Sequence, residues 1–126
     1  MARHLLDEAQ LHPAIRSVVA SHHVDTVQAV QAAIAEHRVV IVGMAGNPVV
    51  SKAREALLAQ RIAYKYLEYG SYFSQWRRRN ALKMWTGWPT FPMVFVDGIL
   101  VGGYKDLQAL IVSGELASML SITRAR

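Results

Sequence analysis

The sequence predicts one α/β domain with a mixed four-stranded sheet, and three observations support this class. Two strand-like runs separated by a helix pattern predict a parallel β-α-β unit with a right-handed crossover. Two further apolar runs flank Asp97-Gly98, a strong signal for a two-residue antiparallel hairpin. Helix patterns before, between and after the strands supply cover for both faces of the sheet. The 126 residues suffice for one such domain.

The first part of the chain is predicted to form two helices. Residues 12–19 place Pro13 near the first turn of a short helix, and a break follows at residues 22–24. Asp25 is expected to be the N-cap of a second helix, which ends near His37. The apolar face of this second helix recurs at helical spacing and comprises Val27, Val30, Ala33 and Ile34.

The β-α-β unit follows these helices. Residues 39–42 are a continuous apolar, β-branched run, which suits a strand covered on both faces. Asn47 and Pro48 predict a helix start, with asparagine at the N-cap and proline at the first helical position, and that helix runs to about Gln60. Residues 62–67 are predicted to form the second strand.

The second half of the chain is predicted to contain a basic helix, a hairpin and two closing helices. The basic helix carries Arg77–Arg79, and Gly114 is expected to end the helix that follows the hairpin. The expected ranges are 71–85 for the basic helix, 93–96 and 99–101 for the hairpin strands, and 106–112 and 116–120 for the closing helices.

The chain contains no cysteine, which excludes several kinds of chemistry. Disulfides, thiolate zinc sites, cysteine-ligated iron–sulfur clusters and a thiol nucleophile of the chain's own are all ruled out. The five histidines show no metal-ligand spacing, so no metal site is expected. No apolar run is long enough to span a membrane, and the first residues lack the apolar stretch of a signal peptide. A soluble cytoplasmic protein is expected.

The net charge of +5 lies mainly in the second half. Residues 64–126 hold eight basic and four acidic side chains, with Arg77–Arg79 and Lys83 close together. This run is compatible with an anionic ligand or, together with nearby aromatic residues, with nucleic acid. A solvated helix face with aromatic side chains in the core explains the same pattern and is favoured over nucleic-acid binding.

Several motifs in the second half resemble the glutaredoxin family. Arg79, Leu82 and Lys83 precede them at the family's spacing. The motifs are Trp88-Pro89-Thr90-Phe91-Pro92, Val94-Phe95-Val96-Asp97-Gly98, Gly102-Gly103-Tyr104, Asp106-Leu107 and Ser113-Gly114-Glu115-Leu116. The WPTFP form is most similar to monothiol glutaredoxins. The resemblance covers about Thr26 to Leu120 and implies a thioredoxin-like three-layer sandwich for residues 25–126, with residues 1–24 as an N-terminal helical extension.

The chain departs from the family at the position of the redox cysteine. Alignment on Ala53 places Asn47 where the family has its nucleophile and Val50 at the second position of that motif. In the family a helix N-terminus lowers the pKa of the thiol through its free amides and its dipole. An amide side chain forms no nucleophilic anion near neutral pH, but it is a good N-cap. We therefore expect the helix start to be kept and the redox role to be lost.

The resemblance also implies a glutathione groove. In the family the backbone before the cis-proline, here Phe91 before Pro92, pairs with the cysteine moiety of glutathione. Backbone amides at a helix start, here Gly103 to Lys105, hold the γ-glutamyl carboxylate, and an acidic residue, here Asp106, holds the amine. The candidate groove residues are Arg79, Thr90, Phe91, Pro92, Gly103, Tyr104, Lys105 and Asp106. The family's lysine before the cysteine is absent, because Met44-Ala45-Gly46 stands there.

Four functions are compatible with this combination. The favoured one is a non-catalytic module in redox homeostasis that binds glutathione, a similar small anion or a protein partner at the former active-site face. The alternative is a glutathione-dependent oxidoreductase or transferase, active in electron transfer through the thiol of bound glutathione. Iron–sulfur trafficking, often by dimers in the family, is disfavoured without a thiolate, although a homodimer is compatible with the sequence. Nucleic-acid binding ranks last.

Overall fold

The sheet of the computed structural model, which describes residues 3–121, has the strand order β2-β1-β3-β4. The strands are β1 (Val39–Gly43), β2 (Lys65–Glu68), β3 (Met93–Val96) and β4 (Ile99–Gly102). β1 pairs in parallel with β2 and antiparallel with β3, and β3 pairs antiparallel with β4. This is the predicted mixed sheet, with β1 at its centre and a register irregularity at Val94/Phe95.

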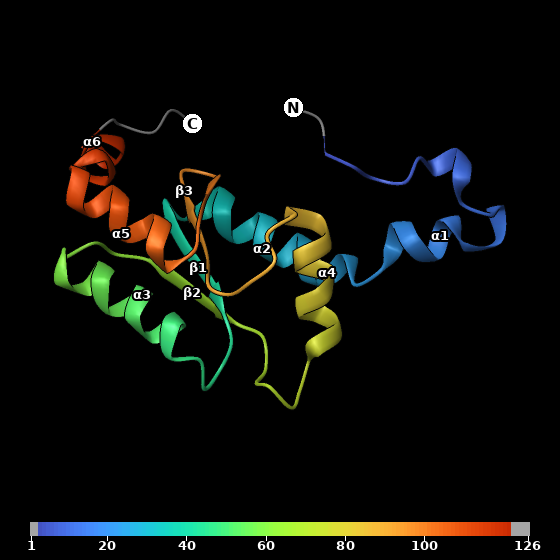
Figure 1. Ribbon diagram of the computed structural model, residues 1–126, viewed down its shortest axis with the longest axis horizontal. Coiled ribbons are helices and arrows are strands. Elements are labelled where there is room, and N and C mark those ends of the chain that lie inside the picture. The colour runs from blue at the N-terminus through green and yellow to red at the C-terminus, as the bar shows by residue number, and fades with distance from the viewer. Residues whose placement is uncertain (1–2, 122–126) are drawn as a thin grey trace.

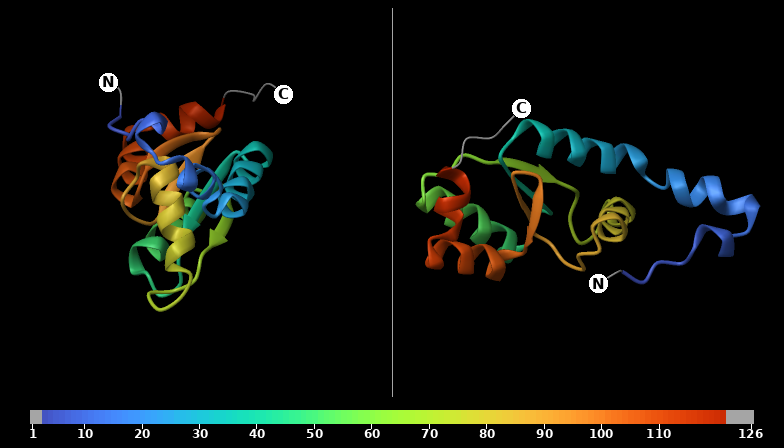
Figure 2. Two further views of the ribbon diagram at one scale, coloured as in Figure 1. Left: turned by 90° about the vertical axis from the view of Figure 1, so that its right-hand side faces the viewer. Right: turned by 90° about the horizontal axis from the view of Figure 1, so that it is seen from above.

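Helices cover both faces of this sheet (Figure 1). α2 (Val24–Glu36) and α4 (Trp76–Thr86) lie on one face, and α3 (Pro48–Ala59) and α5 (Tyr104–Ser113) on the other. α6 (Glu115–Ser121) packs beside α5. A 3-10 turn, η1 (Glu8–Gln10), and α1 (Pro13–Ser21) precede the sandwich and project from it (Figure 2).

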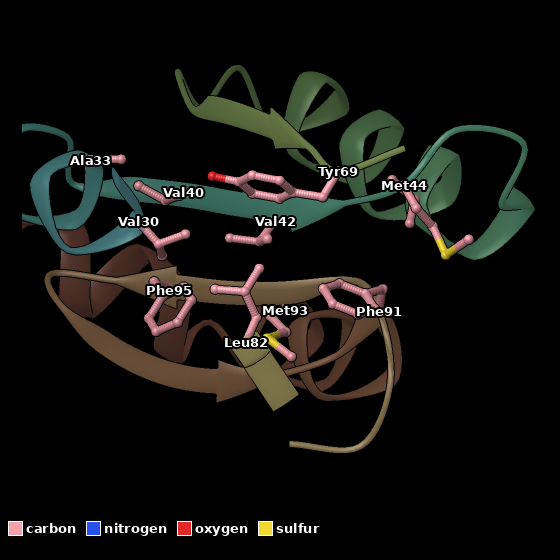
Figure 3. Close-up of a cluster of buried hydrophobic side chains, with 11 residues drawn as sticks. Val30, Ala33, Val40, Val42, Met44, Tyr69, Leu82, Phe91, Met93 and Phe95 are labelled. Atoms are coloured by element: carbon pink, nitrogen blue, oxygen red, sulfur yellow. The ribbon is translucent and has the colours of Figure 1, made fainter. Parts of the chain in front are cut away.

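The alternation of side chains along the strands divides the core into two clusters. Val40 and Val42 of β1 face α2 and α4, whereas Val39 and Ile41 face α3 and α5. The first cluster, drawn in Figure 3, comprises Val30, Ala33, Val40, Val42, Met44, Val50, Tyr69, Leu82, Phe91, Met93 and Phe95. The second comprises Val39, Ile41, Ala53, Leu57, Val94, Val96, Leu107 and Leu116. All side chains of β1 are buried, as the continuous apolar run predicted.

Arg38 holds three segments together at the start of β1. Its guanidinium donates to both carboxylate oxygens of Asp97 in the hairpin turn, at 2.9 and 2.8 Å. It also donates to the carbonyls of Leu120 and Met119 at the end of α6, at 2.9 and 3.3 Å. The hydrogen bond to Asp97 raises the pKa of Arg38. Charge-assisted bonds of this kind fix the hairpin and the last helix relative to β1.

Two predicted helix starts are wrong on the first sheet face. α2 begins at Val24 after His23, whose φ of 44° is left-handed, so Asp25 lies in the first turn and is not the N-cap. α4 begins at Trp76 rather than at residue 71. In residues 71–75 the Ser74 hydroxyl accepts a hydrogen bond from the amide of Ser71, and the Ser71 hydroxyl accepts one from the amide of Phe73. These side-chain hydrogen bonds favour a turn over a helix in this segment.

The starts of β2 and α5 also differ from the predicted positions. β2 begins at Lys65 rather than at residue 62, because the amide of Ile62 bonds to the carbonyl of Leu57 and closes the end of α3. α5 begins at Tyr104, two residues earlier than predicted, because Asp106, its third residue, accepts a hydrogen bond from the backbone amide of Gly103.

Adjacent leucines on α3 provide a matched test of the core. Leu57 is fully buried, whereas Leu58 is 64% exposed. We expect Leu57→Ala to lower the free energy of unfolding by about 2–5 kcal/mol, because it leaves a cavity as well as losing apolar burial. Leu58→Ala should change it by less than about 0.5 kcal/mol. Urea unfolding followed by circular dichroism checks both values, and equal effects would contradict the packing described.

Candidate functional site

The candidate site lies where the N-terminus of α3 faces the segment before β3. Pro48 is the first residue of α3, and Asn47 is its N-cap. The Asn47 side-chain oxygen accepts hydrogen bonds from the amides of Val49 at 2.9 Å and Val50 at 3.2 Å. This confirms the predicted cap. Because the oxygen is committed to the helix, only the amino group of the carboxamide is left to face outward.

Val50, at the second position of the family's redox motif, is a core residue. It is 2% exposed and packs in the first cluster. A methyl group added at Gly43 would meet the Val50 side chain at 2.7 Å, so β1 and α3 approach closely here. A buried valine in this position supplies no group that reacts with or binds a ligand.

The segment before β3 forms the opposite wall. The Phe91–Pro92 peptide bond is cis, as expected for Pro92, and both residues are buried. A cavity of about 300 Å³ lies between this wall and Asn47. Its lining comprises Met44, Asn47, Tyr72, Arg79, Lys83, Pro89, Thr90 and Phe91.

A second cavity, of about 410 Å³, adjoins the first at Thr90 and Phe91 and ends at the start of α5. Its lining comprises Val49, Lys52, Trp88, Thr90, Phe91, Pro92, Gly103, Tyr104, Lys105 and Asp106. The two cavities, which we call the groove, therefore bring together all eight groove residues expected from the sequence. Residues that are spread over positions 79 to 106 of the sequence thus form one surface.

Asp106 has a structural task in addition to its place in the groove. One of its carboxylate oxygens accepts a hydrogen bond from the backbone amide of Gly103 at 3.0 Å. This hydrogen bond caps the start of α5. The first amides of an α-helix have no partner within the helix, so the start of α5 offers N–H donors to an anion. The groove thus places the N–H donors of a helix start beside a carboxylate.

Arg79 lies at the other end of the groove and is 7% exposed. Its guanidinium donates to the carbonyl of Tyr69 at 2.8 Å and to the carbonyl of Ser74. These bonds hold the connection after β2 against α4. Arg79 therefore orders the loop behind the groove, and its binding of a ligand carboxylate remains a prediction.

The groove is also lined by two lysines, Lys52 and Lys83, that were not expected from the sequence to bind a ligand. Lys52 lies one turn into α3, and Lys83 places its ammonium 5.8 Å from the centre of the Phe91 ring. Trp88 is a further wall residue, and its buried indole N–H has no acceptor within residues 3–121. The signal for Lys52 is its spacing: Val49 and Lys52, three residues apart, share one helix face.

The groups around the groove do not fit a cluster or metal held by this chain. Within residues 3–121, no three histidine, aspartate or glutamate side chains come together. Iron–sulfur clusters require thiolate or comparable ligands, and the Asn47 oxygen already accepts two hydrogen bonds.

Within residues 3–121 no helix has the length and apolar character needed to cross a bilayer.

Comparison with known proteins gives the family. A glutaredoxin-like protein of Dictyostelium discoideum is 51% identical over 102 residues, which are 81% of this chain and 83% of that protein. The chain belongs to the glutaredoxin family. A probable monothiol glutaredoxin of Rickettsia prowazekii matches 42 residues at 45% identity, 33% of this chain and 39% of that protein. No family model matches the chain.

Solved structures confirm the thioredoxin-like glutaredoxin fold. The crystal structure of oxidized glutaredoxin 2 from Chlamydomonas reinhardtii has a TM-score of 0.68 at 26% identity and covers 78% of this chain and 92% of its own. A buckwheat glutaredoxin–glutathione complex has a TM-score of 0.71 at 22% identity, with 80% and 92% covered. The family is thus established by sequence, and the sandwich by structure.

The Asn47 cap can be tested by its contribution to stability. We expect Asn47→Ala to lower the free energy of unfolding by about 1 kcal/mol, because two amides at the start of α3 lose their acceptor. Asn47→Ser should keep most of that stability, because serine is also a good N-cap. Chemical unfolding measures both. An alanine variant as stable as the wild type would show that the cap is dispensable.

Proposed function

We propose that this glutaredoxin is a binding module that holds glutathione, or a similar small anion, without thiol exchange of its own. One observation carries the proposal: the groove brings together the eight residues expected to line it, while Asn47 caps the helix start where the family has its cysteine. Asn47 cannot form a mixed disulfide with any ligand.

The chemistry of the groove fits the charges of glutathione. The tripeptide carries two carboxylates and one ammonium group at neutral pH. Lys52, Lys83 and the first amides of α5 offer positive charge and N–H donors for carboxylates. Asp106 offers a carboxylate for the ammonium group. These residues would hold and orient the ligand, whose own thiol is the only thiol in such a complex.

The same face also suits a protein partner. Tyr72 lines the groove and is 62% exposed, and Phe73 beside it is almost fully exposed. Aromatic side chains that stand in solvent next to a cavity are typical of interaction surfaces. We therefore include in the proposal a partner that docks at the former active-site face, in place of glutathione or together with it. A location in the cytoplasm remains part of the proposal.

Titration with glutathione tests the proposal directly. Isothermal titration calorimetry should show binding, and the amide signals of Phe91 and Tyr104 should shift in NMR spectra, because these residues line the groove. Signals from β2, at the far edge of the sheet, serve as the internal control. An absence of heat and of shifts at Phe91 and Tyr104 would refute the binding of glutathione.

The role of Lys52 gives a second measurement. We expect Lys52→Met to weaken glutathione binding about 10- to 100-fold, because a charge-assisted hydrogen bond contributes roughly 1.5–3 kcal/mol. The matched control is Lys65→Met, which removes the same charge from an exposed position on β2 that does not line the groove. Calorimetry of both variants decides between a local contact and general attraction of an anion. Equal losses would contradict the assigned contact.

A further inference from the structure

The N-terminal arm, residues 3–24, presents an apolar face that residues 3–121 leave largely exposed. No residue of α1 is buried. Ile15, Val18 and Val19 share one face of this helix by their spacing, and Val18 is 61% exposed. Arg3 lies against Gly87 at the end of α4, so the arm leaves the sandwich there, runs outward and returns through α1 (Figure 2).

A helix of this length needs a packing partner. α1 has nine residues, and isolated helices shorter than about 12–15 residues are marginal in water. The stability of most helices in proteins comes from burial of an apolar face. Within residues 3–121 no residue of α1 is buried, so the apolar face of this helix is available to a second molecule.

The apolar face continues from the arm onto the sandwich. A hollow of about 260 Å³ lies at the base of α1 and contains Met84, which is 63% exposed. Its lining comprises Val19, Ala20, His22, Val24, Val27, Ala81, Met84 and Trp85, none of which lines the groove. In the irregular segment of the arm that precedes η1, Leu5 and Leu6 are also largely exposed.

We propose that a second copy of this chain covers this face in a two-fold symmetric dimer. The helix face formed by Ile15, Val18 and Val19 is apolar and therefore complementary to itself, as an isologous interface requires. Two α1 helices would pack antiparallel across the axis, and Leu5 and Leu6 of each copy would cover the hollow of the other. This proposal is independent of ligand binding in the groove.

Size and charge both favour a second copy. The exposed apolar side chains of the arm and hollow present on the order of several hundred Å², more than single scattered residues and comparable with the roughly 800 Å² per partner of a standard interface. The arm carries Arg3, Arg16, Asp7 and Glu8, so its formal charge is zero with histidine neutral, although the whole chain carries +5. Two arms can therefore approach without the repulsion that other faces of this basic chain would meet.

Sedimentation of the full chain at micromolar concentrations tests the dimer. The wild type should have twice the mass of one chain, and Val18→Asp should be a monomer, because it places a charge at the centre of the apolar face. Val112→Asp is the matched control, because Val112 is 78% exposed on α5 and should leave the dimer intact. Since α1 buries no residue, Val18→Asp should also keep the fold, which circular dichroism checks. A monomeric wild type, or a dimer that survives Val18→Asp, would overturn the proposal.

Single-cysteine crosslinking gives an independent readout, because the chain has no cysteine of its own. Val18→Cys should form a covalent dimer under mild oxidation with oxidised glutathione, since antiparallel α1 helices bring the two sulfur atoms close to the axis. Val112→Cys should stay monomeric on a non-reducing gel under the same conditions. Equal crosslinking of the two variants would overturn the proposed interface.

Discussion

The candidate site is built on the helix start that the Asn47 carboxamide caps by accepting two hydrogen bonds. They start α3, and α3 forms one wall of the groove and packs Ala53 and Leu57 onto the sheet. In a thiol-dependent glutaredoxin the same amides stabilise a thiolate. Here an uncharged side chain satisfies them permanently. The helix start is therefore capped without a reactive group.

The strands and the Asn47 cap were predictable from the sequence because each depends on local chemistry, whereas the groove residues were expected from the resemblance to glutaredoxins. β1 is a buried apolar run, and Asn47-Pro48 is a helix start in any context. The start of α4 was not predictable in this way, because Ser71 and Ser74 compete with helix through side-chain hydrogen bonds. The position of Lys52 in the groove depends on how α3 faces Phe91, and only the tertiary structure gives that orientation. Arg79 was expected to contact a ligand. Its hydrogen bonds to the backbone carbonyls of Tyr69 and Ser74 depend on the conformation of the loop after β2, which only the tertiary structure gives.

The two surfaces that we assign lie at different parts of the molecule. The groove is framed by α3, the segment before β3 and the start of α5, whereas the arm projects beyond α2 and α4. A dimer formed through the arm would leave both grooves open. Such an assembly would present two binding sites in one particle, which raises the apparent affinity for any partner with two copies of the recognised group.

The most direct measurement of the central claim is turnover of a mixed disulfide of glutathione with a small thiol. The proposed function holds that the groove of this glutaredoxin still binds its ligand and that the exchange chemistry is lost because Asn47 stands in place of the cysteine. The account predicts no turnover by the wild type above the uncatalysed rate and a clear gain in Asn47→Cys, since the helix start would then activate a thiolate beside the groove. Turnover by the wild type, or an inactive Asn47→Cys variant that is folded, would contradict it.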